Sequence, residues 1–119
     1  MVHRMSVGVD QTGAVLGRFL SYLSARQELI ASNIANADTP GYKARDVEMP
    51  LDFSGAMQEA RDSVVDVPGL TVRNDGNNVS IDREARLLAE NTLKFTLATQ
   101  MLRGEIKGIR SAIEEGRAA

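Results

Sequence analysis

The chain of 119 residues contains no cysteine and no tryptophan, and only three phenylalanines, two tyrosines and three prolines. The lack of cysteine excludes disulfides, thiolate nucleophiles and thiolate metal sites, and it leaves the redox compartment open. With so few aromatic residues, the interior has to be built from Leu, Ile, Val, Ala and Met. That set of side chains suits packing between helices.

Long apolar runs and a strong net charge are also missing. No stretch approaches 18 uncharged apolar residues, so we expect no direct insertion into a membrane. The first residues lack the apolar run and cleavage site of a secretory signal, so we expect any export to proceed without a cleaved signal peptide. A formal net charge of -2 provides no general attraction for nucleic acid. Apolar residues make up 43% of the chain, which favours one folded domain over residues 1–119.

The usual parts of an active site are scarce. The single histidine, His3, stands in an expected loose terminus, and neither a nucleophile elbow nor a phosphate-binding loop is present. The segment from Asp75 to Glu84 resembles a calcium loop, but it lacks the central glycine and the ligand spacing. We therefore expect no catalytic residue, no cofactor and no metal. The enzymatic alternative is a hydrolase that uses Asp38, Asp46 and Glu48.

Two stretches carry the 4-3 spacing of a heptad seam. The first predicts a helix over residues 14–37, and the second a helix over residues 82–115 that is roughly 50 Å long, with Ser80 or Asp82 as its N-cap. These seams predict a mainly α fold in which two long terminal helices pack as a coiled-coil-like pair. The first seam contains Leu16, Leu20, Leu23, Gln27, Ile30, Ile34 and Ala37. The second contains Ile81, Ala85, Leu88, Thr92, Phe95, Thr99, Leu102, Ile106, Ile109 and Ile113.

The middle of the chain shows no sustained helical period. We expect an irregular, loosely structured connecting segment over residues 38–69, with a short helix around residues 54–62. A short β-hairpin is expected over residues 70–81, turning at Asp75-Gly76 and pairing Val72 with Val79. Pro40-Gly41 predicts a type II turn that ends the first helix.

Each helix has residues that its seam leaves outside. On the second helix Leu93, Leu97 and Met101 lie roughly opposite the seam. These residues either meet a neighbouring molecule or are covered by the middle of the same chain. On the first helix the expected outward positions are Val15, Tyr22, Leu29 and Asn36, with Asn33 nearby. The two amides either bond the backbone of another chain or satisfy carbonyls in the last helical turn.

The stretch "RQELIASNIANADTPGYKARDVE", residues 26–48, resembles the N-terminal signature of the rod and hook family of bacterial flagellar axial proteins. Residues 79–113 are similar to the C-terminal helix of that family. The short span between the helices resembles the proximal rod subunits more than members with large inserted domains.

This resemblance implies a structural subunit of the flagellar basal-body rod, which crosses the periplasm, connects the inner-membrane ring and export gate to the distal rod, and transmits torque. The implied partners are other copies of the chain, other rod proteins, the hook-basal-body protein FliE and the export gate. The residues expected at subunit contacts, or in shaping the connecting turn, are Asn33, Ile34, Asn36, Thr39, Pro40, Gly41 and Tyr42. Leu93, Leu97 and Met101 are expected at subunit contacts.

The alternative function is a soluble coiled-coil adaptor or export chaperone. Such a protein would stop at a dimer or a 1:1 complex, whereas an axial subunit assembles into a larger array.

Overall fold

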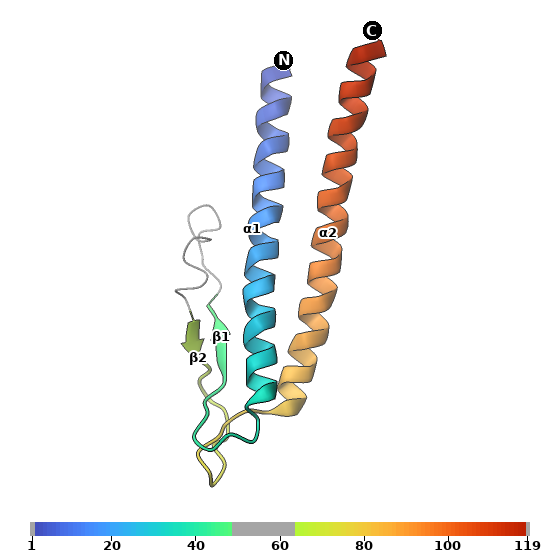
Figure 1. Ribbon diagram of the computed structural model, residues 1–119. Coiled ribbons are helices and arrows are strands. Elements are labelled where there is room, and N and C mark those ends of the chain that lie inside the picture. Colours follow the sequence, from blue (N-terminus) through green and yellow to red (C-terminus); the bar gives the residue numbers. More distant parts are fainter. Residues whose placement is uncertain (1, 49–63, 119) are drawn as a thin grey trace.

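The computed structural model describes residues 2–48 and 64–118, with side chains from residue 11 onward. Two long helices run antiparallel side by side, and a two-stranded sheet lies against the first of them (Figure 1). The elements are α1 (Val2–Ala35), β1 (Arg45–Val47), β2 (Val64–Asp66) and α2 (Ile81–Ala118). The molecule is 71 Å long and 24 by 16 Å across. The mainly α fold with a paired set of terminal helices is therefore confirmed.

The helices are longer at their free ends than the sequence predicted. Helix α1 begins at Val2 instead of residue 14, and it ends at Ala35. Helix α2 begins at Ile81, where Ser80 is the N-cap because its hydroxyl oxygen accepts a hydrogen bond from the amide of Arg83 at 3.3 Å. Within the described residues, neither helix contains an apolar stretch sufficient to cross a membrane.

The small sheet lies elsewhere than predicted. Strands β1 and β2 pair antiparallel, with Arg45 opposite Asp66 and Val47 opposite Val64. The structure thus contains the expected two-stranded antiparallel sheet between the helices, but it falls in the segment expected to be irregular. The helix expected over residues 54–62 lies outside the described residues.

Residues 70–81 form a tight turn without a β-ladder. The amide of Gly76 donates to the carbonyl of Arg73 at 2.9 Å, and the amide of Arg73 donates to the carbonyl of Asn77 at 2.8 Å. This is a three-residue loop with Gly76 at a φ of 85°. The predicted pairing of Val72 with Val79 is wrong by one position, because it assumed a two-residue loop. A shift of one residue reverses the faces, so Val79 is buried while Val72 is exposed.

Helix α1 buries its predicted seam and one more face. Leu16, Leu23 and Ile30 are buried, whereas Ile34 is exposed. Tyr22, expected to face outward, is buried with Leu23 and Val47 in the core cluster. Strand β1 lies against that face of α1, so the middle of the same chain covers Tyr22 and part of Leu29. Val15, on the same stripe, remains 43% exposed.

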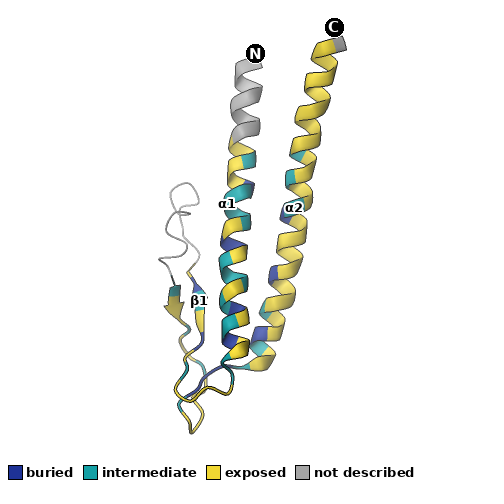
Figure 2. Ribbon diagram, viewed as in Figure 1, coloured by how far each residue is buried: buried dark blue, intermediate teal, exposed yellow. Residues whose placement is uncertain are grey.

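Helix α2 contacts α1 through a face other than the predicted seam. Its buried residues are Glu84, Asn91 and Ala98, spaced seven apart and mostly polar. Figure 2 shows α2 exposed along most of its length, with buried positions confined to the side that faces α1. The apolar seam predicted to pack on α1 is mostly solvent-exposed, since Ile81, Leu88, Phe95, Ile106, Ile109 and Ile113 all have exposed side chains.

Candidate functional site

Asn33 connects the end of α1 to the segments that follow it. Its side chain is 1% exposed, so the expectation that it faces outward is wrong. The amide nitrogen donates to the carbonyl of Arg45 at 2.9 Å and to Oε1 of Glu84 at 3.2 Å. The amide oxygen accepts from the amide of Arg45 at 3.1 Å and from the hydroxyl of Tyr42 at 3.0 Å. One side chain therefore joins α1, the start of β1 and the first turn of α2.

Asn36 completes the end of α1. Its amide nitrogen donates to the carbonyl of Ser32 at 2.8 Å, and its oxygen accepts from the hydroxyl of Thr39 at 3.1 Å. This is the local alternative that the sequence left open, in which the amide satisfies a carbonyl of the last turn. The chain then reverses in a type II turn, where the amide of Tyr42 donates to the carbonyl of Thr39 at 3.2 Å and Gly41 has a φ of 76°.

Two further asparagines hold the loop before α2 against this turn. The amide nitrogen of Asn77 donates to the carbonyls of Asn36 and Thr39, at 2.8 and 2.9 Å, and its oxygen accepts from the amide of Val79 at 2.8 Å. The oxygen of Asn78 accepts from the amide of Ala44 at 2.6 Å. We call Asn33, Asn36, Asn77 and Asn78 the asparagine junction. It replaces a large apolar core at this end of the molecule with hydrogen bonds to the backbone.

A charge cluster lies next to the junction. The guanidinium of Arg26 forms two hydrogen bonds of 3.1 Å with the carboxylate of Asp46. Arg83 lies 3.8 Å from the same carboxylate and donates to Oε1 of Glu84 at 2.9 Å. The Oε2 atom of Glu84 is buried and has no hydrogen-bond partner. The cluster joins α1, β1 and α2.

Burial raises the pKa of the Glu84 carboxyl above its ordinary value. The hydrogen bond from Asn33 and the positive charge of Arg83 oppose that rise without cancelling it. Burial alone would lower the pKa of Arg26, but its hydrogen bonds and ion pair with Asp46 outweigh burial, and the pKa of Arg26 is raised. Arg26 therefore stays charged, and burial favours the protonated form of Glu84.

The raised pKa of Glu84 gives a test by pH. The folded chain binds the proton of Glu84 more tightly than the unfolded chain does, so the associated stability is present below pH 4.5 and is lost as the pH rises through the folded pKa. We expect the free energy of unfolding of the wild type, relative to Glu84→Gln, to increase as the pH is lowered from 7 toward 4.5. Urea unfolding followed by circular dichroism at several pH values measures this difference.

The matched control is Glu90→Gln, which removes the same charge from an exposed position on α2. This variant keeps Glu84, so we expect it to gain stability relative to Glu84→Gln on acidification, as the wild type does. A wild type that loses stability relative to Glu84→Gln on acidification would show that the buried carboxylate is the favoured form.

The residues expected at subunit contacts occupy two different places. Tyr42 is half-buried, while Thr39, Pro40 and Gly41 lie exposed in the connecting turn. Ile34 is exposed at the end of α1. Leu93, Leu97 and Met101, which we call the outer stripe, have 60%, 51% and 60% of their surface exposed on α2. Among the described residues, then, the middle of the chain leaves the outer stripe uncovered.

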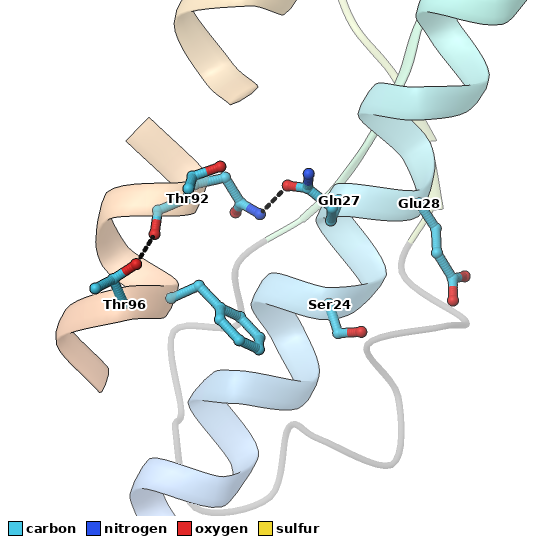
Figure 3. Close-up of a pocket in the computed structure, with 7 residues that line it drawn as sticks. Ser24, Gln27, Glu28, Thr92 and Thr96 are labelled. Carbon is cyan, nitrogen blue, oxygen red and sulfur yellow. Dashed lines mark hydrogen bonds between the residues drawn. The ribbon is translucent and has the colours of Figure 1, made fainter. Parts of the chain in front are cut away.

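A shallow groove of about 370 Å³ lies between α1 and α2 (Figure 3). Asn91 crosses its floor, donating to Oε1 of Gln27 at 2.8 Å and to the carbonyl of Leu23 at 2.9 Å. Phe95 lies exposed on the α2 side. The lining residues are Ser24, Gln27, Glu28, Asn91, Thr92, Phe95 and Thr96.

The carboxylates of the hydrolase alternative do not form a site of their own. Asp46 is taken up by its ion pair with Arg26, and Asp38 and Glu48 are exposed. Over the described residues, no group of three or more acidic or histidine side chains is arranged to hold a metal ion.

Sequence reasoning missed the residues that join the two helices. Asn77 and Asn78 were assigned to a hairpin turn. Glu84 and Asn91 could not be told apart from the exposed polar residues of the second helix. One signal was available: buried positions 84 and 91 share the seven-residue spacing of the seam, one position before it. Polar residues at that spacing become recognisable only when their partners are known.

Comparison with known proteins supports the class that this fold suggests. Residues 19–43, which cover the last half of α1 and the following turn, match the profile of the family described as "Flagella basal body rod protein". The matched segment contains Asn33, Asn36 and the turn at Pro40-Gly41. The class defined by fold and site is thus that of the flagellar basal body rod proteins.

Relatives extend the similarity to most of the chain. The flagellar basal body rod protein FlgB of Escherichia coli (strain K12) is 33% identical over 82% of this chain and 88% of its own length. FlgB of Yersinia enterocolitica is 34% identical over 82% of this chain and 89% of its own length. FlgB of Aeromonas hydrophila is 32% identical over 92% of this chain and 98% of its own length. The chain belongs to the FlgB family of flagellar basal body rod proteins.

Proposed function

We propose that this chain is a structural subunit of the flagellar basal-body rod and that it assembles through its terminal helices. The observation that carries the proposal is the exposed apolar surface of α2. The outer stripe and the predicted seam both lie uncovered on this helix. A large group of exposed apolar side chains on a protein surface marks an interaction site.

Burial energetics favour assembly. Removing apolar surface from water stabilises by roughly 25 cal/mol per Å², so covering three large side chains of the outer stripe contributes several kcal/mol at each contact. The described chain cannot gain this energy by itself, because α1 occupies only one side of α2. A repeating array of subunits gains it at every contact.

The finer parts of the proposal concern place and partners. The subunit lies in the periplasm-spanning rod, connects the inner-membrane ring and the export gate to the distal rod, and transmits torque. Its partners are other copies of the chain, other rod proteins and the hook-basal-body protein FliE. Support comes from family membership and from the elongated helical shape. A rod element under torque benefits from two long helices held at one end by the asparagine junction.

The role of the turn residues is proposed separately. Thr39, Pro40 and Gly41 are exposed beside Ile34, and the asparagine junction fixes the backbone beneath them. A rigid exposed turn loses little conformational entropy when it is docked. We assign these residues to a contact with a neighbouring subunit, supported from inside by Asn33 and Asn36.

Leu97→Asp tests the proposal. Leu97 is exposed in the middle of the outer stripe, so the substitution should leave the helicity of the isolated chain unchanged. We expect incorporation into the rod, and with it motility, to be lost, because an aspartate buried at a subunit contact has no partner charge. Circular dichroism measures helicity, and purified basal bodies together with swimming assays measure incorporation.

The matched control is Ala89→Asp, which adds the same charge to an exposed position of α2 that lies about 80° around the helix from Leu97. It should assemble normally. Normal assembly of Leu97→Asp would show that the outer stripe is not a contact. A wild-type chain that forms only a discrete 1:1 complex with one client would favour the adaptor or chaperone alternative.

A further inference from the structure

Two surfaces of α2 that face in opposite directions carry exposed apolar side chains. One is the outer stripe. The other is the groove against α1, where the side chain of Phe95 is 42% exposed. Leu93 and Leu97 each lie two residues from Phe95, which places both about 160° around the helix from it. The outer stripe and the groove are therefore on opposite sides of α2.

The two surfaces differ in shape. The outer stripe belongs to a single helix and projects three long apolar side chains from it. The groove has two walls, of which one contains Thr92, Phe95 and Thr96 of α2 and the other Ser24 and Glu28 of α1 (Figure 3). A close-packed interface requires projecting side chains on one partner to meet a concave surface on the other. The outer stripe of one copy thus complements the groove of another, and one contact removes both apolar surfaces from water.

Surfaces on opposite sides of a helix give a contact that repeats. A copy whose outer stripe occupies the groove of a neighbour still has its own groove open, and the neighbour still has its own outer stripe exposed. Such heterologous contacts form rings or helical arrays, whereas a contact between two identical patches stops at a pair. A repeating array is what a rod subunit has to build.

The charges beside the two surfaces are complementary. Lys94 is exposed about 60° around α2 from Leu97, on the flank of the outer stripe that is nearer to α1. In a second copy that is displaced sideways without being turned, this flank faces the α1 wall of the groove, where Glu28 is exposed. Their heights along the helices also agree. Asn91 bonds to Gln27, which is next to Glu28, and Lys94 lies less than one turn beyond Asn91.

The same charges select the direction of the second copy. If that copy is turned end to end, its outer stripe still faces the groove, but the two flanks of the stripe change places. Gln100, which lies about 60° from Leu97 on the other flank, then faces Glu28, and Lys94 points away from it. An ion pair with Glu28 therefore forms only when the helices of both copies point the same way.

We propose that the outer stripe of one copy of this chain seats in the groove of the next copy, with Lys94 of the first paired to Glu28 of the second, and that this contact repeats from copy to copy. The inference rests on the proposed function and deepens it, because it names the surface that receives the outer stripe. Neighbouring copies then lie side by side with their helices in the same direction.

The absence of cysteine permits a direct test with full-length chains in basal bodies. Thr92→Cys places one thiol in the groove, and Leu97→Cys places one in the outer stripe. Basal bodies from cells that make both variants are treated with a short bismaleimide, which links two nearby thiols. We expect a dimer linked between residues 92 and 97, identified by mass spectrometry, and little dimer when either variant is made alone. A chain with both cysteines should give products longer than a dimer.

Ala89→Cys, combined with Leu97→Cys, is the matched control. Ala89 is exposed on α2 outside the groove and the outer stripe. This combination should give little cross-linked product. Circular dichroism of the purified chains verifies equal helicity in all variants.

The ion pair is tested by reversing its charges. Lys94→Glu in both cysteine variants replaces an attraction by a repulsion at every contact, and we expect roughly tenfold less cross-linked product. Adding Glu28→Lys reverses the other partner and should restore the product. Lys107→Glu removes the same charge from an exposed position further along α2 and should change the yield little.

Four results would overturn the inference. The first is a mixture of Thr92→Cys and Leu97→Cys that gives no more dimer than the Ala89→Cys control. The second is efficient cross-linking of Leu97→Cys to itself, which indicates a contact between two outer stripes. The third is cross-linking of Leu97→Cys only to a different protein. The fourth is a failure of the double charge reversal to restore the product. If the cysteine variants are still incorporated into basal bodies, these results remove the contact between stripe and groove and leave the proposed function standing.

Discussion

Replacing Asn33 with alanine is expected to lower the free energy of unfolding by about 3 kcal/mol, because several buried groups lose their partner at once. The amide and the carbonyl of Arg45 both bond to this side chain, as do the hydroxyl of Tyr42 and the carboxylate of Glu84. Alanine also leaves space where the amide stood. The loss should appear first at the contact between α1 and β1.

Urea unfolding followed by circular dichroism measures the change in stability, and amide hydrogen exchange at Arg45 reports it locally. The control is Ile34→Ala, the next residue along α1. Its side chain is exposed, so we expect a change within about 0.5 kcal/mol. Similar stability of Asn33→Ala and Ile34→Ala would mean that the asparagine junction does not hold the two helices together.

The second large effect is expected from Gly76→Ala, with a loss of about 2 kcal/mol or more. Gly76 has a φ of 85°, which an L-residue rarely adopts. A Cβ atom at this position would also lie 3.3 Å from the Cα atom of Gly41. Because that neighbour is backbone, the loop has to move away from the turn. The hydrogen bond from the amide of Gly41 to the carbonyl of Asp75, 2.8 Å long, would then be strained or broken.

Gly69→Ala separates the two causes. Gly69 has a similar φ of 77°, but a Cβ atom there would meet nothing within 4 Å. We expect Gly69→Ala to cost about 1 kcal/mol from backbone strain alone. Thermal unfolding of both variants gives the comparison. Equal losses would show that the close approach of Gly76 to Gly41 contributes no stability.

Both predictions concern the closed end of the helical pair. There Arg73 adds two further links, since its guanidinium donates to the carbonyl of Val79 at 2.6 Å and to the carbonyl of Ala37. Side chains from the segment between residues 33 and 84 thus join the ends of the two helices, mostly by hydrogen bonds to backbone groups. Away from this end, α2 has few buried side chains. One end of the helical pair is therefore stabilised within the chain, while the rest of α2 leaves apolar side chains exposed. This arrangement fits a subunit that buries the exposed part of α2 against its neighbours.

Local patterns predicted the helices, the turn and the apolar surplus. The 4-3 spacing that includes Leu16, Leu23 and Ile30 identified the buried side of α1. This was possible because all residues of one helical face belong to the same short segment of the chain. Pro40-Gly41 specified a type II turn through the φ values that these two residues allow. Helical geometry placed Leu93, Leu97 and Met101 opposite the seam, and the structure decided that they are exposed.

Pairing between distant segments could not be predicted in the same way. The turn around Asp75 was recognised, but its three-residue loop was not, and the error of one residue placed Val72 inside instead of Val79. The position of the short sheet was wrong because three-residue strands such as Arg45–Val47 show no alternation long enough to detect. Asn77 looked like an ordinary turn residue, since its acceptors lie about 40 positions earlier in the chain.

The sequence by itself determined that two long helices flank a turn and that α2 has more apolar surface than one partner helix covers, because helical periodicity is a local property. Only the tertiary structure decided which face of α2 meets α1. Apolar spacing favoured the heptad seam, yet Glu84 and Asn91 occupy the contact because Asn33, Gln27 and the carbonyl of Leu23 offer hydrogen bonds there. Polar groups are buried where partners exist, and those partners are brought together only by the fold.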